Sequence, residues 1–397
     1  MDTLEQQRFF SRELLDWYVR SKRDLPWRRH RDPYYIWVSE IMLQQTRVDT
    51  VIPYFNRFIE KFPTVESLAD APEDEVLKCW EGLGYYSRAR NLQFAARQVK
   101  EQYGGIIPSG REEVAGLKGV GPYTAGAIRS IAFNLPAPAV DGNVMRVLSR
   151  FFLIEEDIMK GSTRSHMEDL VVKLIPEGRA SDFNQGLMEL GALVCTPKSP
   201  KCLTCPVMEH CSGRIAGKED SLPVKTKAKP PRPEYRLAAI VEGTGSYAGK
   251  VLIRKRPAAG LLAGMWELPH VAESPTGGTA GVSLPDEAAM DRLADALRED
   301  IPVSPLEHYM NAEHTFSHIH WNMRVFRCTL RWAEDTGLTT AESAAAYEVR
   351  PKGTGGAVQD ATGANGTFRW IDKEDMELYA FPNVFLRILN RYFSSPS

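Results

Sequence analysis

The sequence predicts a multidomain protein in which an all-α domain, residues 1–221, is followed by an α+β domain, residues 237–397. Apolar residues recur at helical spacing through the first part, whereas short apolar runs typical of strands dominate the second. Residues 222–236 contain four prolines and three lysines, a composition typical of an extended linker without regular structure. At 397 residues the chain is also longer than a single domain usually is.

Two helices of the first domain have clear starts and ends. The acidic residues that follow Pro72 are typical of a helix N-terminus, and the helix that they begin is expected to stop at Gly82. A second helix, residues 86–103, is expected to end at Gly104, because glycine adopts the left-handed conformation of a helix C-terminus without steric cost. The first domain is therefore expected to consist of short helices separated by glycine-rich turns.

The second domain is expected to combine short strands with one helix. The strands are expected at residues 237–241, 250–254 and 320–330, and the helix at residues 286–299. Two segments rich in Gly, Thr and Ala, residues 274–281 and 353–367, are typical of mobile insertions.

Composition excludes fibrous, disordered and membrane-spanning proteins. Hydrophobic residues make up 43% and charged residues 25% of the chain, as in ordinary soluble globular proteins. No apolar run approaches the roughly 18 residues of a transmembrane helix. The polar N-terminus, residues 1–5, resembles neither a secretory signal nor a transit peptide. We therefore expect no membrane association and a cytoplasmic location.

The net charge of −2, taken over the whole chain, argues against a nucleic-acid-binding protein. The charge is unevenly distributed, however. Between residues 195 and 232, eight basic residues stand against three acidic ones. A local surplus of this kind attracts phosphate groups even in a chain that is nearly neutral.

Four of the six cysteines form one group, with the spacing C-x6-C-x2-C-x5-C. Thiols in the cytosol are kept reduced, so such a group favours a metal site over disulfides. Four thiolates suit zinc, but a single C-x-x-C with two longer arms also suits a 4Fe-4S cluster, and the spacing leaves both open. The four candidate ligands are Cys195, Cys202, Cys205 and Cys211. Cys79 and Cys328 lie alone in apolar surroundings and are expected to be core residues.

The segment L-K-G-V-G-P-Y-T-A-G-A, residues 117–127, is typical of a helix-hairpin-helix turn. Its glycines allow a tight turn, and Pro122 suits the first position of the helix that follows. Free amides at such a helix start bind the phosphates of a nucleic acid without reading its sequence. The alternative is a simple turn between packed helices.

Two carboxyl groups form a possible catalytic pair. Glu40 lies among apolar residues on an expected helix, and Asp141 precedes another helix. Taken singly, Glu40 could be a surface residue and Asp141 an N-cap. Taken together, they suit cleavage of a glycosidic bond, which needs one protonated acid and one ionised carboxylate. Apolar surroundings are expected to raise the pKa of Glu40, and the helix N-terminus to keep Asp141 ionised.

Five motifs together resemble the MutY-type adenine DNA glycosylases of the endonuclease III superfamily. They are S-E-I-M-L-Q-Q-T (39–46), G-L-G-Y-Y-S-R-A-R-N-L (82–92), the hairpin (117–127), V-D-G-N-V-M-R-V-L-S-R (140–150) and the cysteine array (195–211). The resemblance covers nearly the whole chain. It implies a six-helix barrel module with the hairpin, an iron-sulfur module with a 4Fe-4S cluster, and removal of adenine paired with 8-oxoguanine or guanine. The substrate is then double-stranded DNA, from which the base is flipped into a pocket.

The resemblance also implies a role for individual residues. Glu40 would protonate adenine at N7, and Asp141 would stabilise or trap the sugar cation. Tyr123 and Asn143 would align Asp141, the substrate and the catalytic water. Trp27, Arg28 and Gln185 would line the adenine pocket. The DNA-binding residues would be Gln45, Tyr85, Leu117, Gly119, Val120 and Gly121, with Gln45 and Tyr85 entering the duplex. For Tyr85 the alternative is a core aromatic residue.

Position 123 distinguishes two activities within the superfamily. Glycosylase-lyases carry a lysine there, whose amine forms a Schiff base with the sugar. Tyr123 has no such amine. The sequence therefore predicts a monofunctional glycosylase with weak or no strand cleavage. The protein is also expected to be a monomer.

The C-terminal domain resembles a Nudix fold, because G-L-L-A-G-M-W-E-L-P (260–269) matches the segment that precedes the Nudix box. The carboxylate-rich box itself is missing, which predicts recognition rather than hydrolysis. Phe316, Ser317 and His318 resemble the loop that senses 8-oxoguanine. His314 and His320 lie nearby, but alternate residues of a strand point to opposite faces, so a shared metal site is not expected.

Three other functions are compatible with part of the pattern. A thymine mismatch glycosylase or a glycosylase-lyase would share the fold, but relatives of those kinds often lack the acid at position 40 and the C-terminal domain. A non-enzymatic DNA-binding or redox protein would use the hairpin and the cluster alone. Hydrolysis of a nucleoside triphosphate would need the missing Nudix box.

Overall fold

The computed structural model describes residues 3–227, 229–273, 285–331 and 368–394. The insertions expected at residues 274–281 and 353–367 lie outside the described residues. The chain divides into two compact units, one within Met1–Ala71 and Arg88–Ala228 and the other within Pro72–Ser87 and Lys229–Ser397. No helix in the described ranges is long and apolar enough to cross a membrane.

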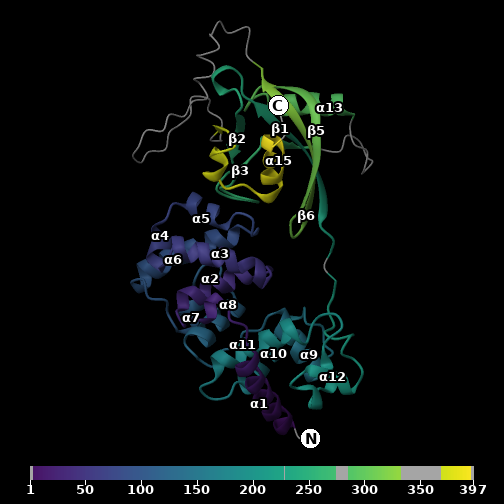
Figure 1. The fold of residues 1–397 in the computed structure, drawn as a ribbon. Helices are drawn as coiled ribbons and strands as arrows, with labels where there is room; N and C mark the ends of the chain where they lie inside the picture. The colour runs from purple at the N-terminus through teal and green to yellow at the C-terminus, as the bar shows by residue number, and fades with distance from the viewer. Residues whose placement is uncertain (1–2, 228, 274–284, 332–367, 395–397) are drawn as a thin grey trace. The chain divides into compact units, whose positions relative to one another are not determined.

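The first unit is built from helices, as predicted (Figure 1). Its longer helices are α1 (Thr3–Ser21), α2 (Pro33–Leu43), α3 (Val48–Lys61), α6 (Ser87–Tyr103), α9 (Gly142–Phe151), α10 (Gly161–Leu174) and α11 (Ala180–Leu193). Its short helices are α4 (Val65–Asp70), α7 (Arg111–Ala115), α8 (Pro122–Ala127), a π-helix (Ile128–Ala132) and α12 (Ser212–Ile215). The 3-10 turns are Pro26–Arg28, Cys202–Thr204 and Met208–His210.

One core of this unit joins helices that are distant along the chain. Phe10 and Leu14 of α1 pack with Phe151 of α9 and with Phe183 of α11, all four fully or almost fully buried. Three of the cluster-forming cysteines pack against the same core. The N-terminal helix therefore fixes the two helices, α9 and α11, that flank the site described below.

The second unit contains a mixed seven-stranded sheet, in which β3, β2, β1, β6 and β5 lie in that order while β4 pairs with β1 and β7 with β2 (Figure 1). The strands are β1 (Arg232–Glu242), β2 (Val251–Lys255), β3 (Trp266–Glu267), β4 (His270–Ala272), β5 (Val303–Thr315), β6 (Ile319–Leu330) and β7 (Phe368–Ile371). The helices are α5 (Glu73–Trp80), α13 (Asp286–Leu297) and α15 (Asn383–Ser394), and 3-10 turns lie at Gly245–Tyr247 and Asp375–Glu377.

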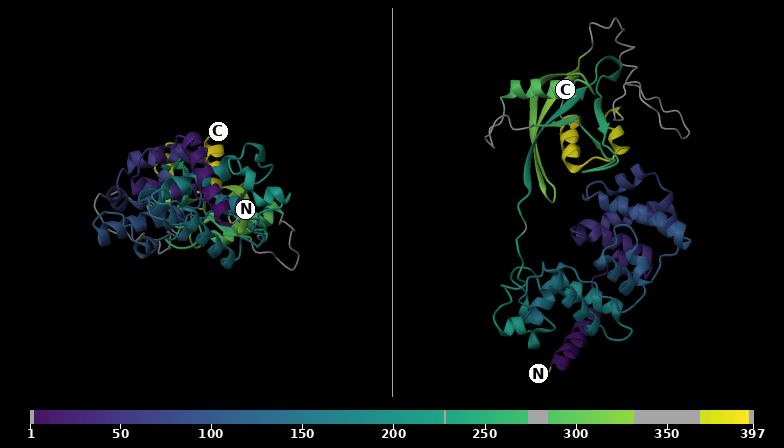
Figure 2. Two further views of the ribbon diagram at one scale, coloured as in Figure 1. Left: turned by 90° about the horizontal axis from the view of Figure 1, so that it is seen from below. Right: turned by 180° about the vertical axis from the view of Figure 1, so that it is seen from behind.

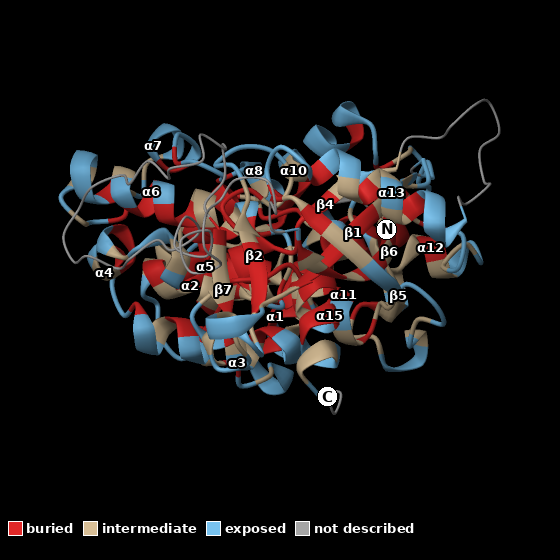
Figure 3. Cartoon of the chain, turned by 90° about the horizontal axis from the view of Figure 1, so that it is seen from above, coloured by how far each residue is buried: buried red, intermediate tan, exposed pale blue. Residues whose placement is uncertain are grey.

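Helices cover both faces of this sheet. Ala238 and Ile240 of β1 pack with α15, whereas Leu237 and Ala239 pack with α13 on the opposite face. The right-hand view in Figure 2 shows α13 (green) and α15 (yellow) beside the strands, and in Figure 3 much of β2 and part of β1 are red, that is, buried. A strand that is buried on both faces has a continuous run of apolar residues, and this pattern predicted the strand at residues 237–241.

The linker predicted at residues 222–236 is ordered at both ends. Residues 232–236 belong to β1 and pair in parallel with β6, so the prediction that they have no regular structure is wrong. Pro233 is compatible with this strand, because its missing N–H removes one ladder bond while the neighbouring residues keep theirs. At the other end Leu222 is buried, and its carbonyl accepts a hydrogen bond from Arg150.

The 72–87 segment is grouped with the second unit, although it lies within the predicted helical domain 1–221 along the chain. Lys78 of α5 donates to the carbonyls of Met376 and Tyr379 at 2.9 and 3.2 Å. Lys255 of β2 donates to both carboxylate oxygens of Asp74 at 2.8 Å. These contacts tie α5 to the strand β2 and to the chain that precedes α15.

Candidate active site and nucleic-acid interface

Helix α2 places Glu40 in the interior of the first unit. The helix begins where Asp32 accepts a hydrogen bond from the amide of Tyr34 at 2.8 Å and Pro33 occupies the first helical position. Its residues 36–42 are all buried, and Glu40 is only 5% exposed. Glu40 is therefore an internal carboxyl group and not a surface residue.

The surroundings of Glu40 favour its protonated form. Burial raises the pKa of Glu40 to about 7, with a further rise from Asp141, while the hydrogen bond from Tyr123 and the charge of Arg28 oppose the increase. The Tyr123 hydroxyl donates to Oε2 of Glu40 at 2.6 Å. A carboxyl group with such a pKa can donate a proton near neutral pH, so the predicted rise is confirmed in direction.

Asp141 is both an N-cap and a residue of the site. Its Oδ1 accepts from the amide of Val144 at 2.7 Å at the start of α9, and its Oδ2 accepts from Nδ2 of Asn143 at 2.8 Å. Arg146 in turn donates to Oδ1 of Asn143 at 2.8 Å and fixes the orientation of that amide. Burial nevertheless raises the pKa of Asp141, although these hydrogen bonds favour the ionised form. The helix N-terminus thus acts as predicted, but it does not hold the pKa of Asp141 at its ordinary value.

Both carboxyl groups face one cavity of about 710 Å³, a size typical of ligand sites. Its wall brings together most of the residues predicted for catalysis, adenine binding and DNA binding. The predicted residues that line it are Trp27, Arg28, Glu40, Gln45, Gly119, Gly121, Tyr123, Asp141, Asn143 and Gln185.

The placement of Tyr123 differs from the prediction. Its hydroxyl is bonded to Glu40, whereas Asp141 is held by Asn143. Because Tyr123 is the second residue of α8, it approaches the cavity from the hairpin side. It is therefore placed to act on the protonated acid rather than to align Asp141.

Helices α7 and α8 form the predicted helix-hairpin-helix. The turn between them needs glycine at position 119, where φ is +79° and a Cβ atom would lie 2.7 Å from Cβ of Asn91. Leu117 and Val120 are buried, so these two residues can contact DNA only through their main chain. Gly119 and Gly121 are exposed and border the cavity.

The two predicted wedge residues are both exposed and both have positive φ angles. Gln45 lies two residues after the end of α2 and has φ of 59°. Arg88 stabilises this helix end by donating to the carbonyls of Ile41 and Gln44 at 2.7 and 2.6 Å. Tyr85, in the second unit, has φ of 49° and is 43% exposed. The alternative that Tyr85 is a core aromatic residue is therefore wrong.

Two further charged residues line the cavity, Arg23 and Glu189, and neither was predicted from the sequence. Glu189 lies one helical turn after Gln185 on α11, so the same helix face carries both. This spacing is the signal that could have identified Glu189. Arg23 has no comparable signal, because it lies in an irregular segment between α1 and the Pro26–Arg28 turn.

The four clustered cysteines line a single pocket of the first unit. The pocket is otherwise largely apolar, and Nη1 of Arg150 lies 3.3 Å from Sγ of Cys195, which suits a thiolate. Four thiols around one pocket suit the corners of an iron-sulfur cluster.

The loop Phe316–His318 joins β5 and β6 into a hairpin. Ser317 and His318 are exposed, while the ring of Phe316 packs edge-on against Trp321 at 4.9 Å between centroids. His314 lies on β5 and His320 on β6, so the prediction that these histidines share one strand is wrong.

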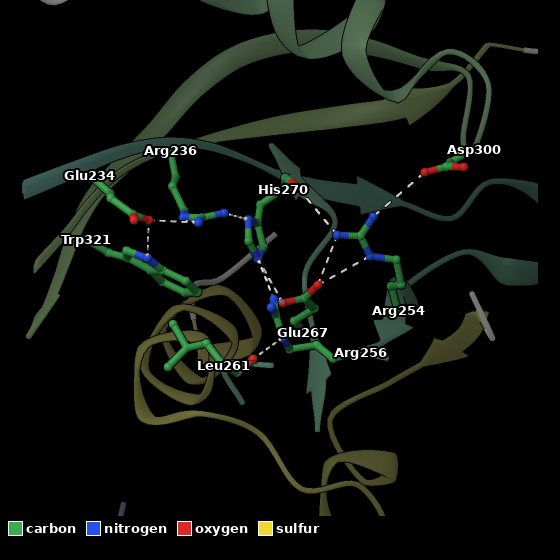
Figure 4. A network of polar contacts seen from close by, with 9 residues as sticks. All are labelled: Glu234, Arg236, Arg254, Arg256, Leu261, Glu267, His270, Asp300 and Trp321. Carbon is green, nitrogen blue, oxygen red and sulfur yellow. Dashed lines mark hydrogen bonds and ion pairs between the residues drawn. The ribbon is translucent and has the colours of Figure 1, made fainter. Parts of the chain in front are cut away.

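A polar network surrounds Trp321, the residue on which Phe316 packs (Figure 4). Arg236 lies 4.4 Å above the Trp321 ring, and Glu234 accepts a hydrogen bond from the indole of Trp321 at 3.1 Å. Trp321 also packs against His270, which lies 2.8 Å from Glu267. Burial alone would raise the pKa of Glu267, but His270, Arg256 and Arg254 lower the pKa to about 2. Glu267 comes from the Nudix-like segment 260–269, which here has a structural role.

Three family models match parts of the chain. The model of the HhH-GPD superfamily base excision DNA repair proteins matches residues 38–173. The iron-sulfur binding domain of endonuclease III matches residues 195–211, and a NUDIX domain matches residues 244–391. The chain is thus a DNA N-glycosylase of the helix-hairpin-helix superfamily that carries a 4Fe-4S cluster and a Nudix-like domain.

The adenine DNA glycosylase of Rattus norvegicus is 40% identical over 369 residues, which cover 81% of this chain and 70% of the rat protein. That of Homo sapiens is 38% identical over 388 residues, covering 85% and 70%. This chain belongs to the adenine DNA glycosylase family. A solved thermostable thymine-DNA glycosylase is 33% identical with a TM-score of 0.49, covering 54% of this chain and 99% of the other.

Proposed function

We propose that this chain removes adenine from double-stranded DNA when the base is paired with 8-oxoguanine or guanine, in base excision repair. The single observation that carries the chemistry is the buried Glu40, with a pKa of about 7, in one cavity with Asp141. The names of the rat and human relatives support adenine as the base removed. Unlike Glu40, an exposed acid would be ionised at neutral pH and could not protonate a leaving base.

In the proposed reaction Glu40 donates its proton to N7 of a flipped adenine, which makes the base a neutral leaving group. The bond between N9 and C1′ breaks, and its electron pair departs with adenine. Asp141 stabilises or traps the cation that forms on the sugar. A water molecule finally adds its oxygen to C1′, and the proton that it loses restores the acid form of Glu40. Asn143 holds Asp141, while Tyr123 holds Glu40.

Other residues of the cavity wall, together with residues outside it, are proposed to bind the base and the DNA. Trp27, Arg28 and Gln185 would contact adenine. The hairpin amides around Gly119 and Gly121 would contact phosphates, and Gln45 and Tyr85 would enter the duplex. Phe316, Ser317 and His318 would contact the base opposite adenine. The iron-sulfur cluster, when bound, cross-links its four cysteines and so stabilises the adjacent basic segment.

The test measures base release from duplexes that contain adenine opposite 8-oxoguanine, adenine opposite guanine, or thymine opposite guanine. We expect release of adenine from the first two and none of thymine. Glu40→Gln and Asp141→Asn should each slow release by about 100-fold to 10,000-fold. Base release that survives in both variants would contradict these roles for Glu40 and Asp141. No release from any duplex by the wild-type protein, with DNA binding unchanged in both variants, would favour a DNA-binding protein without chemistry. Release of thymine would favour the mismatch glycosylase.

Strand cleavage provides a second measurement. Because Tyr123 has no amine, the wild-type protein should not be trapped on its DNA product by borohydride. Efficient trapping would contradict the monofunctional reaction.

The monomeric state and the cytoplasmic location stay predictions. The same holds for the proposed domain boundaries, 1–221, 222–236 and 237–397.

A further inference from the structure

Glu189 is a buried carboxylate that the proposed reaction does not use. It lies on α11, one turn after Gln185, and its side chain is only 1% exposed. It nevertheless belongs to the wall of the cavity that holds Glu40 and Asp141. A buried charge is costly unless it is fully paired, so its partners decide what it does.

Both partners are arginines from the segment between α1 and α2. Oε1 of Glu189 accepts from the amide and Nε of Arg23 at 3.1 and 2.9 Å and from Nη1 of Arg28 at 3.1 Å. Oε2 accepts from Nη2 of Arg23 and from Nη2 of Arg28, each at 2.8 Å. Two guanidinium groups thus bind one carboxylate, each through two hydrogen bonds, which fixes their planes as well as their positions.

These arginines lie between two cavities. Arg23 and Arg28 line the 710 Å³ cavity and also a second cavity of about 290 Å³, together with Trp27 and Gln185. Arg28 has only 13% of its side chain exposed. The wall that the proposed substrate base would meet is therefore held in place from one side by Glu189.

We propose that Glu189 is a positioning residue for the glycosylase reaction: it orients the Arg28 guanidinium toward the adenine site and offsets part of its positive charge next to Glu40. This inference rests on the proposed function. Glu189 itself does not contact the base, since both of its oxygens are bonded to arginines. It acts through Arg28, the residue that faces both the base and the acid.

The charges around Glu40 give the direction of the effect. The positive charge of Arg28 lowers the pKa of Glu40, against the larger rise caused by burial. Loss of the Glu189 charge leaves Arg28 less compensated, so the pKa of Glu40 falls and less of the acid is protonated at neutral pH. The charged and titratable groups that face Glu40 or Glu189 are Tyr123, Asp141, Arg28, Arg23 and Tyr18, with Asp49 and Asp182 acting at longer range.

Glu189 itself stays ionised throughout the working range of pH. Burial would raise its pKa, but the hydrogen bonds from Arg23 and Arg28 lower the pKa to about 2. A change in the rate profile of a Glu189 variant near neutral pH therefore reports on Glu40 and not on Glu189. The rate profile therefore distinguishes a positioning role of Glu189 from a purely structural ion pair between α11 and the segment after α1.

The test is a double-mutant cycle with Glu189→Gln and Arg28→Ala, measured in the full-length, cluster-containing protein. Single-turnover release of adenine opposite 8-oxoguanine is followed from pH 5 to pH 9. The matched control is Glu13→Gln, which removes the same charge from a carboxylate that pairs with Arg12 away from the cavity. Brown colour and the melting temperature report folding.

We expect Glu189→Gln to slow release about 10-fold to 100-fold and to move the alkaline limb of the profile to lower pH by about 1 unit. In the Arg28→Ala background the same change should alter the rate by less than about 2-fold. Equal slowing in both backgrounds, or a lower melting temperature with an unshifted limb, would overturn the proposal.

A second variant covers the case in which Glu189→Gln does not fold. Glu189→Asp keeps the charge but shortens the side chain, so it should slow release while the alkaline limb stays in place. A wild-type rate in this variant would contradict positioning. If the wild-type protein releases no adenine from any duplex, the proposed function fails and takes this inference with it. If it does release adenine and Glu189→Gln is unaffected, only this inference fails.

Discussion

The hydroxyl of Tyr123 donates a 2.6 Å hydrogen bond to Oε2 of Glu40. This bond joins α8, the second helix of the hairpin, to α2, the helix that carries the proposed acid. It favours the ionised form of Glu40 and so opposes the larger effect of burial on the pKa. The hairpin that is proposed to bind the DNA backbone therefore also adjusts the protonation of the acid.

Tyr123→Phe should move the alkaline limb of the rate profile to higher pH. Without the hydroxyl, the pKa of Glu40 rises above about 7, and the protonated, active form persists at higher pH. The expected shift is about 1 pH unit, measured by single-turnover base release. Tyr103→Phe, at the end of α6, is the matched control and should leave the profile unchanged. A shift of the alkaline limb to lower pH would mean that the hydrogen bond raises the pKa of Glu40, which would contradict the prediction.

Glu40→Gln should stabilise the protein in alkaline solution. The folded protein holds the pKa of Glu40 at about 7, above its ordinary value of 4.5, so the folded state favours the bound proton. This stabilisation is complete below about pH 4.5 and is lost as the pH rises through about 7, at a cost on the order of 3 kcal/mol. The amide cannot ionise and escapes that cost. Melting temperatures should therefore differ at pH 8 and converge near pH 4, and equal values at pH 8 would contradict the buried-acid interpretation.

Gly119→Ala and Gly121→Ala should differ in stability. Position 119 has φ of +79°, and a Cβ atom there would meet Cβ of Asn91 at 2.7 Å. Position 121 has φ of −86° and open space around its Cβ. We expect Gly119→Ala to cost about 1 to 3 kcal/mol and Gly121→Ala less than about 0.5 kcal/mol in thermal unfolding. Similar losses at the two positions would mean that the turn tolerates a side chain.

Replacing Phe316 and Ser317 together by alanine should remove the preference for 8-oxoguanine over guanine opposite adenine. The ring of Phe316 packs on Trp321, and the hydroxyl group of Ser317 next to it is exposed. The ratio of single-turnover rates on the two duplexes measures the preference. Leu306→Ala with Ser304→Ala, on the same strand β5 but far from the loop, is the control and should keep the ratio. Retention of the ratio by the loop variant would refute the assignment.

Much of the fold could be read from local patterns. The end of α6 at Gly104, the helix α13 and the buried strand β1 follow from glycine conformation and apolar periodicity, which depend on near neighbours. The start of β1 at Arg232 could not be read in this way. Pro233 argues against a strand, and only the parallel partner β6, almost ninety residues further along, overrides that preference.

The sequence by itself determined the chemical groups of the site: an acid among apolar residues, a second acid at a helix start, a glycine-rich hairpin and four spaced cysteines. Their types and spacing carry this information, because each motif has its own local structure. Only the tertiary structure decided which of these groups meet. It bonds Tyr123 to Glu40 rather than to Asp141, raises the pKa of both carboxyl groups by burial, and places Glu189 behind Arg28. Contacts and desolvation of this kind depend on segments that are far apart in the chain, and no local pattern records them.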